Sequence, residues 1–163
     1  MSVQIKIFTT GGSIDKRYST QESSFVVGPP QVERILQDGN VTVDYEIESL
    51  LRKDSLDVTS EDRQGIVERV RETPHRFVVI THGTDTMVDT ARALAPISDK
   101  VIVLTGAMQP AVFKETDASF NIGCAVAAVQ LLPDGVYLVM NGRVFDPQTT
   151  RKDVTRDRFV EAG

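Results

Sequence analysis

The sequence of 163 residues contains a single cysteine, Cys124, so it cannot build an internal disulfide framework. Cys124 stands among small apolar residues, where an inert thiol in the core is the expected state. Only two histidines are present, and no spacing of His, Cys, Asp and Glu is typical of a metal site. We therefore expect no metal and no other cofactor.

Basic stretches and long apolar runs are missing as well. The formal net charge is -5 and the pI is about 5.0, with no basic stripe, so nucleic acid is not expected as a partner. No apolar run reaches the roughly 18 residues that cross a membrane. No charged N-terminal stretch followed by an apolar one is visible, which predicts a cytoplasmic protein if the chain begins at its natural start.

The residues that are present predict a globular chain with a real core. Hydrophobic residues make up 40% and charged residues 25% of the sequence, which is ordinary for such proteins. The length predicts a single domain over residues 1–163 without a second domain.

Apolar strand patterns alternate with helical patterns along the chain. Strands are expected at 3–8, 41–49, 76–83, 100–106 and 135–145, and helices at 28–40, 56–72, 85–96 and 116–135. The third strand is apolar throughout from Phe77 to Ile80, as a strand covered on both faces should be. This order predicts a single three-layer α/β domain in which helices cover both faces of a mostly parallel sheet.

Individual residues mark the ends of some expected helices and strands, and two segments lack a clear pattern of secondary structure. Thr59 or Ser60 should cap the second helix, and Asn141 with Gly142 suggests a hairpin turn. Residues 11–28 form a long connection without a pattern, and such connections are usually functional, for example as a lid. Residues 146–163 are polar and receive no assignment.

Glycines, hydroxyls and carboxylates follow the ends of the first four strands. The residues after the first strand are Thr9, Thr10, Gly11, Gly12 and Ser13, and those after the second are Arg52, Lys53, Asp54, Ser55 and Asp57. The third strand is followed by Thr81, His82, Gly83, Thr84, Asp85 and Thr86, and the fourth by Thr105, Gly106, Ala107, Met108 and Gln109. Ligands of open α/β sheets bind beyond the carboxyl ends of the strands. Any one of these turns can be a mere connection, but together they predict a polar cradle at one edge of the sheet.

The chemistry of this cradle does not point to a histidine base. His75 follows a proline in a loop and is expected at the surface, and His82 is expected to bond its own turn. A hydroxyl close to a carboxylate such as Asp85, or close to a lysine amine, can be activated as a nucleophile. The TTGGS turn is neither a Walker loop nor a dinucleotide fingerprint, so a nucleotide site is not favoured.

Five segments resemble the bacterial-type L-asparaginases. TTGGSID resembles the first signature of that family, and THGTDTM is similar to the second almost letter for letter. VLTGAMQP and LLRKDSLDVTSED resemble two further family segments. VMNGRVFDPQTTRKD resembles the stretch that carries the catalytic lysine of the family. The resemblance covers most of the chain and implies the fold of the N-terminal domain of these enzymes.

The resemblance also implies a reaction and roles for individual residues. Ser13 would be the nucleophile, and Thr84 would be the second catalytic hydroxyl in a proton relay with Asp85 and Lys152. The reaction would be hydrolysis of L-asparagine to L-aspartate and ammonia through an acyl-enzyme. The implied substrate-binding residues are Gly12, Asp54, Ser55, Gly83, Thr84, Asp85 and Ala107. Among them, Ser55 would bind the α-carboxylate and Asp85 the α-amino group, while the amides of Gly12, of its neighbours and of Thr84 would stabilise the oxyanion.

Three residues depart from the family pattern. Ser13 replaces a threonine and lacks the methyl group that restricts χ1. Phe25 stands where the family has a lid tyrosine, and Tyr18 is the alternative source of that hydroxyl. Leu56 replaces a substrate-contacting glutamine, which predicts low glutaminase activity.

Length is a further departure, because typical relatives are about twice as long and use a second domain to complete a neighbour's site. A homodimer or homotetramer is therefore expected. Two other functions stay open on the sequence alone. One is a weakened module that binds asparagine or aspartate, and the other is an amidase of the same fold acting on glutamine or a lactam.

Overall fold

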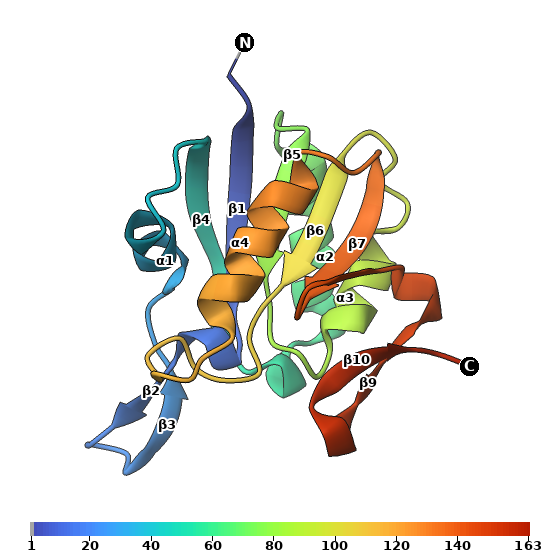
Figure 1. Cartoon of the computed structure of the whole chain (residues 1–163). Coiled ribbons are helices and arrows are strands. Elements are labelled where there is room, and N and C mark those ends of the chain that lie inside the picture. The colour runs from blue at the N-terminus through green and yellow to red at the C-terminus, as the bar shows by residue number, and fades with distance from the viewer. Residues whose placement is uncertain (1) are drawn as a thin grey trace.

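The computed structural model describes residues 2–163, and its centre is a six-stranded sheet in the order β4-β1-β5-β6-β7-β8 (Figure 1). The strands are β1 (Gln4–Gly11), β4 (Asp44–Lys53), β5 (Phe77–Thr81), β6 (Val101–Thr105), β7 (Gly135–Met140) and β8 (Arg143–Phe145). The first five run parallel, and β8 pairs antiparallel with β7. The mostly parallel sheet that the sequence predicts is thus confirmed.

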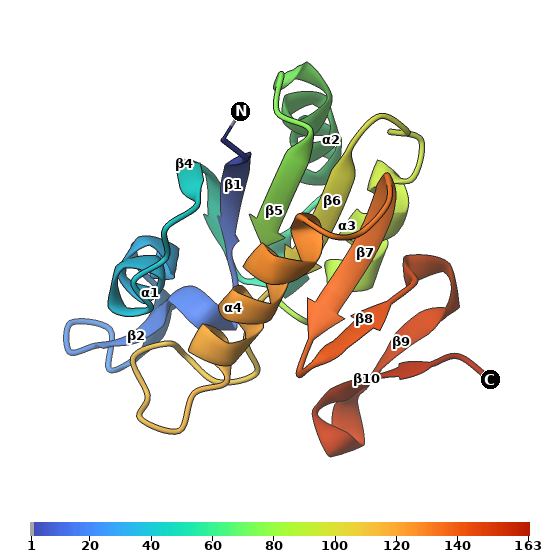
Figure 2. The same cartoon turned by 45° about the horizontal axis from the view of Figure 1, so that its top comes forward.

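Four helices cover the two faces of this sheet. Helices α1 (Val32–Asp38) and α4 (Ala118–Val129) lie on one face, and α2 (Ser60–Glu72) and α3 (Met87–Leu94) lie on the other (Figures 1 and 2). Two hydrophobic cores result, one on each face. The three-layer α/β architecture is confirmed. Within residues 2–163, no helix combines the length and the apolarity that crossing a membrane requires.

The central strands consist of unbroken runs of apolar residues because both of their faces are buried. In β5, Val79 belongs to the core under α1 and α4, while Val78 and Ile80 belong to the core under α2 and α3. Successive side chains of a strand point to opposite faces. Each strand therefore contributes alternately to both cores, and its carboxyl end is left for polar turn residues.

The predicted start of α2 is confirmed by its cap. Thr59 Oγ1 accepts from the amide of Asp62 at 3.1 Å, and the Asp62 carboxylate accepts from the amide of Thr59 at 2.9 Å. This reciprocal pair satisfies two of the free N–H groups at the helix start. The predicted Asn141–Gly142 turn also exists, between β7 and β8, with φ values of 50° and 83° that suit a two-residue hairpin.

Residues 11–28 are ordered, and here the expected structureless connection is wrong. A short 3-10 turn at Ser13–Asp15 leads into a hairpin made of β2 (Lys16–Ser19) and β3 (Ser24–Val27). Figure 1 shows this hairpin extending beyond the carboxyl edge of the sheet. Because its strands are largely exposed, they carry no alternation of apolar and polar residues from which a strand could be predicted.

The C-terminal segment, which the sequence patterns leave unassigned, forms a second hairpin. Strands β9 (Thr150–Asp153) and β10 (Arg158–Glu161) pair antiparallel, with Lys152 opposite Phe159. Phe159 is buried in the core under α2 and α3. Burial of this ring fixes the hairpin to the body of the protein, and it thereby sets the position of the strand that carries Lys152.

Candidate active site

Three strand ends meet through their backbones at the carboxyl edge of the sheet. Gly12 follows β1 and adopts a φ of 84°, and a Cβ placed on it would collide with the backbone of Gly83 after β5. A Cβ on Gly83 would in turn lie 2.5 Å from the Cβ of Ser55, which follows β4. Such contacts are compatible only with glycine. They bring together the turns that carry Ser13, Thr84 and Ser55, as the sequence predicts.

Lys152 reaches this edge from β9 and joins the turn after β5. Its Nζ donates to Thr84 Oγ1 at 2.8 Å and to Asp85 Oδ1 at 2.7 Å. The lysine side chain is mostly buried, and Thr84 is buried as well. A hydroxyl, an amine and a carboxylate held at hydrogen-bond distance form an arrangement that can move a proton to or from a reacting group.

His82 holds the turn in place, as expected, and is not available as a base. Its ring is buried, with Nδ1 2.8 Å from the carbonyl oxygen of Gly83 and Nε2 2.8 Å from Thr90 Oγ1. Burial lowers the pKa of His82 to about 4. Both ring nitrogens are thus occupied by neutral hydrogen bonds that orient the backbone just before Thr84.

Ser55 and Asp54 lie on the neighbouring turn after β4. The carbonyl oxygen of Ser55 accepts from Thr86 Oγ1 at 2.7 Å, which ties this turn to the start of α3. Asp54 Oδ2 lies 2.5 Å from Lys16 Nζ, and its Oδ1 accepts from the amide of Leu56. Burial favours the neutral form of Asp54 and by itself would raise its pKa. The hydrogen bonds from Lys16 and Leu56 and the charge of Lys16 outweigh this effect and lower the pKa overall, with a smaller contribution from the charge of Lys152.

Lys16 is a site neighbour that the sequence reasoning missed. It lies on β2, within the segment expected to have no structure, and its ion pair joins the hairpin to the turn that carries Ser55. The general signal that could have found it is a basic residue soon after the first glycine turn, opposite an acidic residue after the second strand. That signal is weak without knowledge of the hairpin.

Asp15 is a second missed residue, at the base of the same hairpin. Its Oδ1 accepts from the amide of Gln31 at 2.9 Å, and its carbonyl oxygen accepts from the amide of Gly28 at 2.8 Å. The side chain is buried, and burial raises the pKa of Asp15 to about 7 against the opposing effects of the Gln31 hydrogen bond and the Arg52 charge. Asp15 therefore fastens both ends of the hairpin.

The two other predicted catalytic hydroxyls are placed differently from the Thr84 hydroxyl. Ser13 is partly exposed in the 3-10 turn, and its hydroxyl makes no hydrogen bond to residues 2–163. Tyr18 is 55% exposed on the hairpin, and its ring packs edge-on against Phe25 with the centroids 5.6 Å apart. Within the described residues its hydroxyl has no partner either. The structure does not connect Tyr18 to Lys152, and its catalytic role stays a prediction.

The backbone groups that were predicted to contact the substrate differ in whether they are free to do so. The amide of Gly12 donates to the carbonyl oxygen of Lys53 at 2.9 Å in this structure, and its role as an oxyanion donor stays a prediction. The Thr84 amide has no acceptor among residues 2–163 and is available. Ala107 is buried in the core under α1 and α4, and its substrate contact stays a prediction.

Across residues 2–163, no three His, Cys, Asp or Glu side chains are grouped as metal ligands.

Comparison with known proteins relates this geometry to a family. The family model described as Asparaginase, N-terminal matches residues 4–159. L-asparaginase 2-3 of Saccharomyces cerevisiae is 32% identical over 155 residues, which cover 86% of this chain and 42% of the yeast protein. L-asparaginase 2 of Escherichia coli is 43% identical over 84 residues, which cover 48% of this chain and 24% of that protein.

A solved structure gives the same result at the level of the fold. The probable cytoplasmic L-asparaginase from Campylobacter jejuni matches with a TM-score of 0.80 and 27% identity, over 98% of this chain and 53% of that chain. The chain therefore spans only about half, or less, of the length of these similar proteins.

Proposed function

The chain belongs to the asparaginase family, and from this premise we propose that it is an amidohydrolase that converts L-asparagine to L-aspartate and ammonia. The observation that supports the proposal is the Nζ atom of Lys152, which bridges Thr84 Oγ1 and Asp85 Oδ1. Thr84 and Asp85 come from the turn after β5, and Lys152 comes from a hairpin near the C-terminus. A mostly buried lysine that joins a hydroxyl and a carboxylate from another element is an arrangement suited to proton transfer.

The proposed reaction proceeds through an acyl-enzyme. Ser13 Oγ attacks the side-chain carboxamide carbon, and the hydroxyl proton passes by way of Thr84 and Lys152 to the leaving nitrogen, which departs as ammonia. Water then attacks the Ser13 ester, returns a proton to the Ser13 oxygen, and releases L-aspartate. The free amide of Thr84 supplies a donor for the oxyanion, and a single donor of this kind is worth about 10²–10³ in rate.

Substrate length would be limited by the rim of the site. In this proposal Ser55 binds the α-carboxylate and Asp85 the α-amino group, so the length of the substrate side chain decides how well its amide is placed at the hydroxyls. Leu56 follows Ser55, is 73% exposed, and offers no hydrogen bond to a longer side chain. A site gains discrimination mainly through hydrogen bonds to its substrate. We therefore infer low glutaminase activity.

Ammonia release from L-asparagine by the purified protein tests the proposal. Thr84→Ala and Lys152→Met should each lower the rate by about 10²–10⁴, the usual contribution of a positioned acid or base. Matched controls are Thr42→Ala and Lys114→Met, which change exposed residues outside the Lys152 network. Circular dichroism confirms that each variant is folded. If Thr84→Ala and Lys152→Met retain the wild-type rate, the assigned roles are wrong.

A second candidate is a module that binds asparagine or aspartate without turnover. It is favoured by the Ser13 and Tyr18 hydroxyls, for which residues 2–163 supply no hydrogen-bond partner, and by Phe25 in place of a tyrosine. Calorimetry with L-aspartate separates the two functions, because micromolar binding without ammonia release supports the module. A panel of amides that includes L-glutamine and lactams tests a third candidate, another amidase of the same fold.

We further propose that the protein acts in the cytoplasm as a homodimer or homotetramer. The cytoplasmic location is supported by the likeness to the Campylobacter jejuni protein, which is described as a probable cytoplasmic enzyme. Association is supported by Leu56 and Val154, which are 73% and 70% exposed on the segments that follow Ser55 and Lys152. Exposed apolar side chains beside a site often mark an interface. Sedimentation at micromolar concentration measures the assembly directly, and a monomer would contradict this part.

A further inference from the structure

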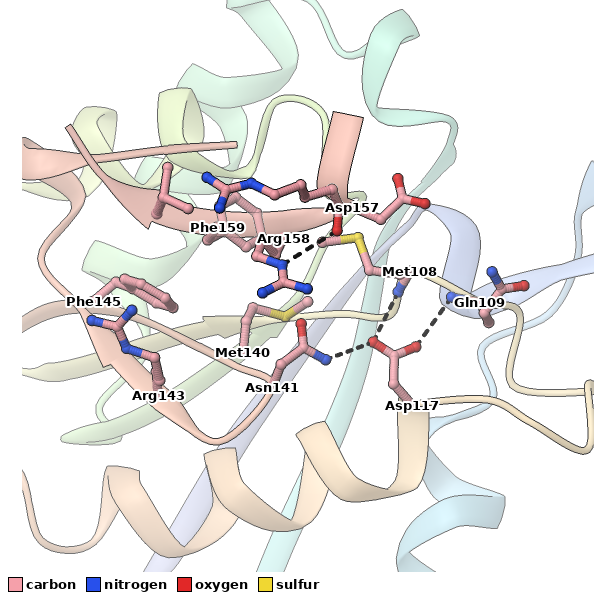
Figure 3. Close-up of a pocket in the computed structure, with 12 residues that line it drawn as sticks. Met108, Gln109, Asp117, Met140, Asn141, Arg143, Phe145, Asp157, Arg158 and Phe159 are labelled. Atoms are coloured by element: carbon pink, nitrogen blue, oxygen red, sulfur yellow. Dashed lines mark hydrogen bonds between the residues drawn. The ribbon is translucent and has the colours of Figure 1, made fainter. Parts of the chain in front are cut away.

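A cavity of about 560 Å³ lies between the β7–β8 turn, β10 and the turn after β6 (Figure 3). Its lining residues are Met108, Gln109, Asp117, Met140, Asn141, Arg143, Phe145, Arg156, Asp157, Arg158, Phe159 and Val160. None of the residues proposed above for catalysis or substrate binding is among them. The volume lies within the range of about 300–1,000 Å³ that is usual for small-molecule sites.

The floor of the cavity is apolar and firmly packed. Met140, Phe145 and Phe159 are all buried in the core under α2 and α3, and the rings of Phe145 and Phe159 lie 6.2 Å apart. Met108 packs against the same core. Because Met140, Phe145 and Phe159 are 1%, 4% and 3% exposed, a ligand placed here would rest mainly on the partly exposed Met108 and Val160, with the buried side chains beneath them.

Three arginines and the exposed Asp157 lie on the rim of the cavity, and one of the three arginines has no carboxylate partner. Arg143 pairs with Glu161 at 3.3 Å, and Arg156 pairs with Asp153 at 2.7 Å. Arg158 makes no ion pair within residues 2–163, and its Nε donates only to the carbonyl oxygen of Arg156 at 3.4 Å. Figure 3 shows the guanidinium of Arg158 directed into the cavity, toward Met140 and Asn141.

The carboxylate of Asp117 also lines the cavity, is partly exposed and makes no ion pair with Arg158. Asp117 accepts from the amides of Met108 and Gln109 at 3.1 Å, and from the side-chain nitrogens of Asn121 and Asn141 at 3.0 Å. With four donors in place, its oxygens are committed to the turn after β6, to α4 and to the β7–β8 turn. Most of the guanidinium donors of Arg158 therefore remain available to a ligand.

We propose that this cavity binds a small organic carboxylate with an apolar body, separately from the active site. The apolar body lies on Met108 and Val160, above the buried Met140, Phe145 and Phe159, and the carboxylate accepts from Arg158. An arginine guanidinium can form two parallel hydrogen bonds with a carboxylate, which is the strongest polar pairing available at this rim. L-Asparagine lacks the apolar body, so the site selects a different class of molecule from the proposed substrate.

Methionine methyl signals in the NMR spectrum test the proposal with phenylacetate as the probe. Protein labelled with ¹³C-methyl methionine reports on Met108 and Met140 at the cavity, while Met87, buried in the core, serves as the internal reference. Phenylacetate should shift the Met108 and Met140 signals in a saturable manner and leave Met87 in place. 2-Phenylethanol, the matched neutral compound, should bind at least about tenfold more weakly, since one charged hydrogen-bonded pair is worth that much or more.

Two variants localise the binding. Arg158→Gln should weaken phenylacetate at least about tenfold, because it removes the free guanidinium. Arg71→Gln, an exposed substitution on α2, should leave the affinity unchanged. The proposal is overturned if phenylacetate produces no saturable shift, if 2-phenylethanol binds equally well, or if Arg158→Gln binds as the wild type does. The comparison of the two compounds on wild-type protein decides the matter even if Arg158→Gln fails to fold.

Discussion

Asp15→Asn should stabilise the protein at neutral and alkaline pH and have little effect in acid. Asp15 is 3% exposed at the base of the β2–β3 hairpin, where its Oδ1 accepts from the amide of Gln31. Burial raises the pKa of Asp15 from the ordinary value of 3.8 to about 7, although the Gln31 hydrogen bond and the Arg52 charge oppose the shift. An asparagine keeps the acceptor oxygen for Gln31 and removes the ionisation.

The sign and the size follow from proton linkage. Between pH 3.8 and about 7 the folded protein retains the proton of Asp15 while the unfolded chain releases it. The contribution of this group to stability is therefore fully present below pH 3.8 and is lost as the pH rises toward 7. With about 1.4 kcal/mol for each pKa unit, the loss between pH 5 and pH 8 is about 3 kcal/mol.

The assay is urea unfolding followed by circular dichroism at pH 5, 6, 7 and 8, for the wild type and for Asp15→Asn. The free energy of unfolding of Asp15→Asn minus that of the wild type should increase by about 3 kcal/mol from pH 5 to pH 8. Thr42→Ala, at an exposed position without an ionisable group, is the control and should give a difference that stays constant with pH. A constant difference for Asp15→Asn would refute the reasoning, because Asp15 would then ionise equally in both states.

Three further predictions concern the turn after β5 and the rim of the site. The wild type should lose about 3 kcal/mol of stability as the pH falls from 6.5 to about 4, because the unfolded chain binds a proton at His82 that the buried ring resists. His82→Gln should remove this loss, and urea unfolding at these pH values measures it. Gly83→Ala should reduce ammonia release at least about 10²-fold, because its Cβ would displace Ser55, whereas Gly65→Ala on α2 meets open space and should leave activity unchanged. Leu56→Gln should raise the ratio of glutaminase to asparaginase rates several-fold, and an unchanged ratio would remove Leu56 as the cause of selectivity.

The parallel sheet and its layers could be predicted because burial on both faces leaves a strong sequence pattern. Val78, Val79 and Ile80 are all apolar because each of them faces one of the two cores. The two hairpins beyond the sheet could not be predicted in the same way. Residues 16–19 and 24–27 are largely exposed, so no core selects alternate apolar positions along them. The structure of residues 11–28 was accordingly missed.

The candidate site was predicted in part, for a similar reason. Parallel strands end at one edge, so the sequence alone predicts that Ser55 and Thr84 approach each other. The Gly12 amide, a predicted oxyanion donor, has the carbonyl oxygen of Lys53 as its acceptor, because the pairing of β1 with β4 shifts register between Thr9 and Gly11. Sequence patterns do not reveal such a local shift.

The asparaginase resemblance, confirmed at the level of the family, supplied what strand patterns could not supply for Lys152. The lysine is 67 positions beyond Asp85, and its approach depends on the C-terminal hairpin, whose only buried aromatic ring is that of Phe159. Phe159 pairs with Lys152 across the hairpin and packs into the core under α2 and α3. Packing of one apolar side chain thus sets the position of an amine on the adjacent strand. Phe159 lies on β10, and its neighbour on that strand, Arg158, lines the cavity. The core therefore anchors both the proposed active site and the proposed carboxylate site.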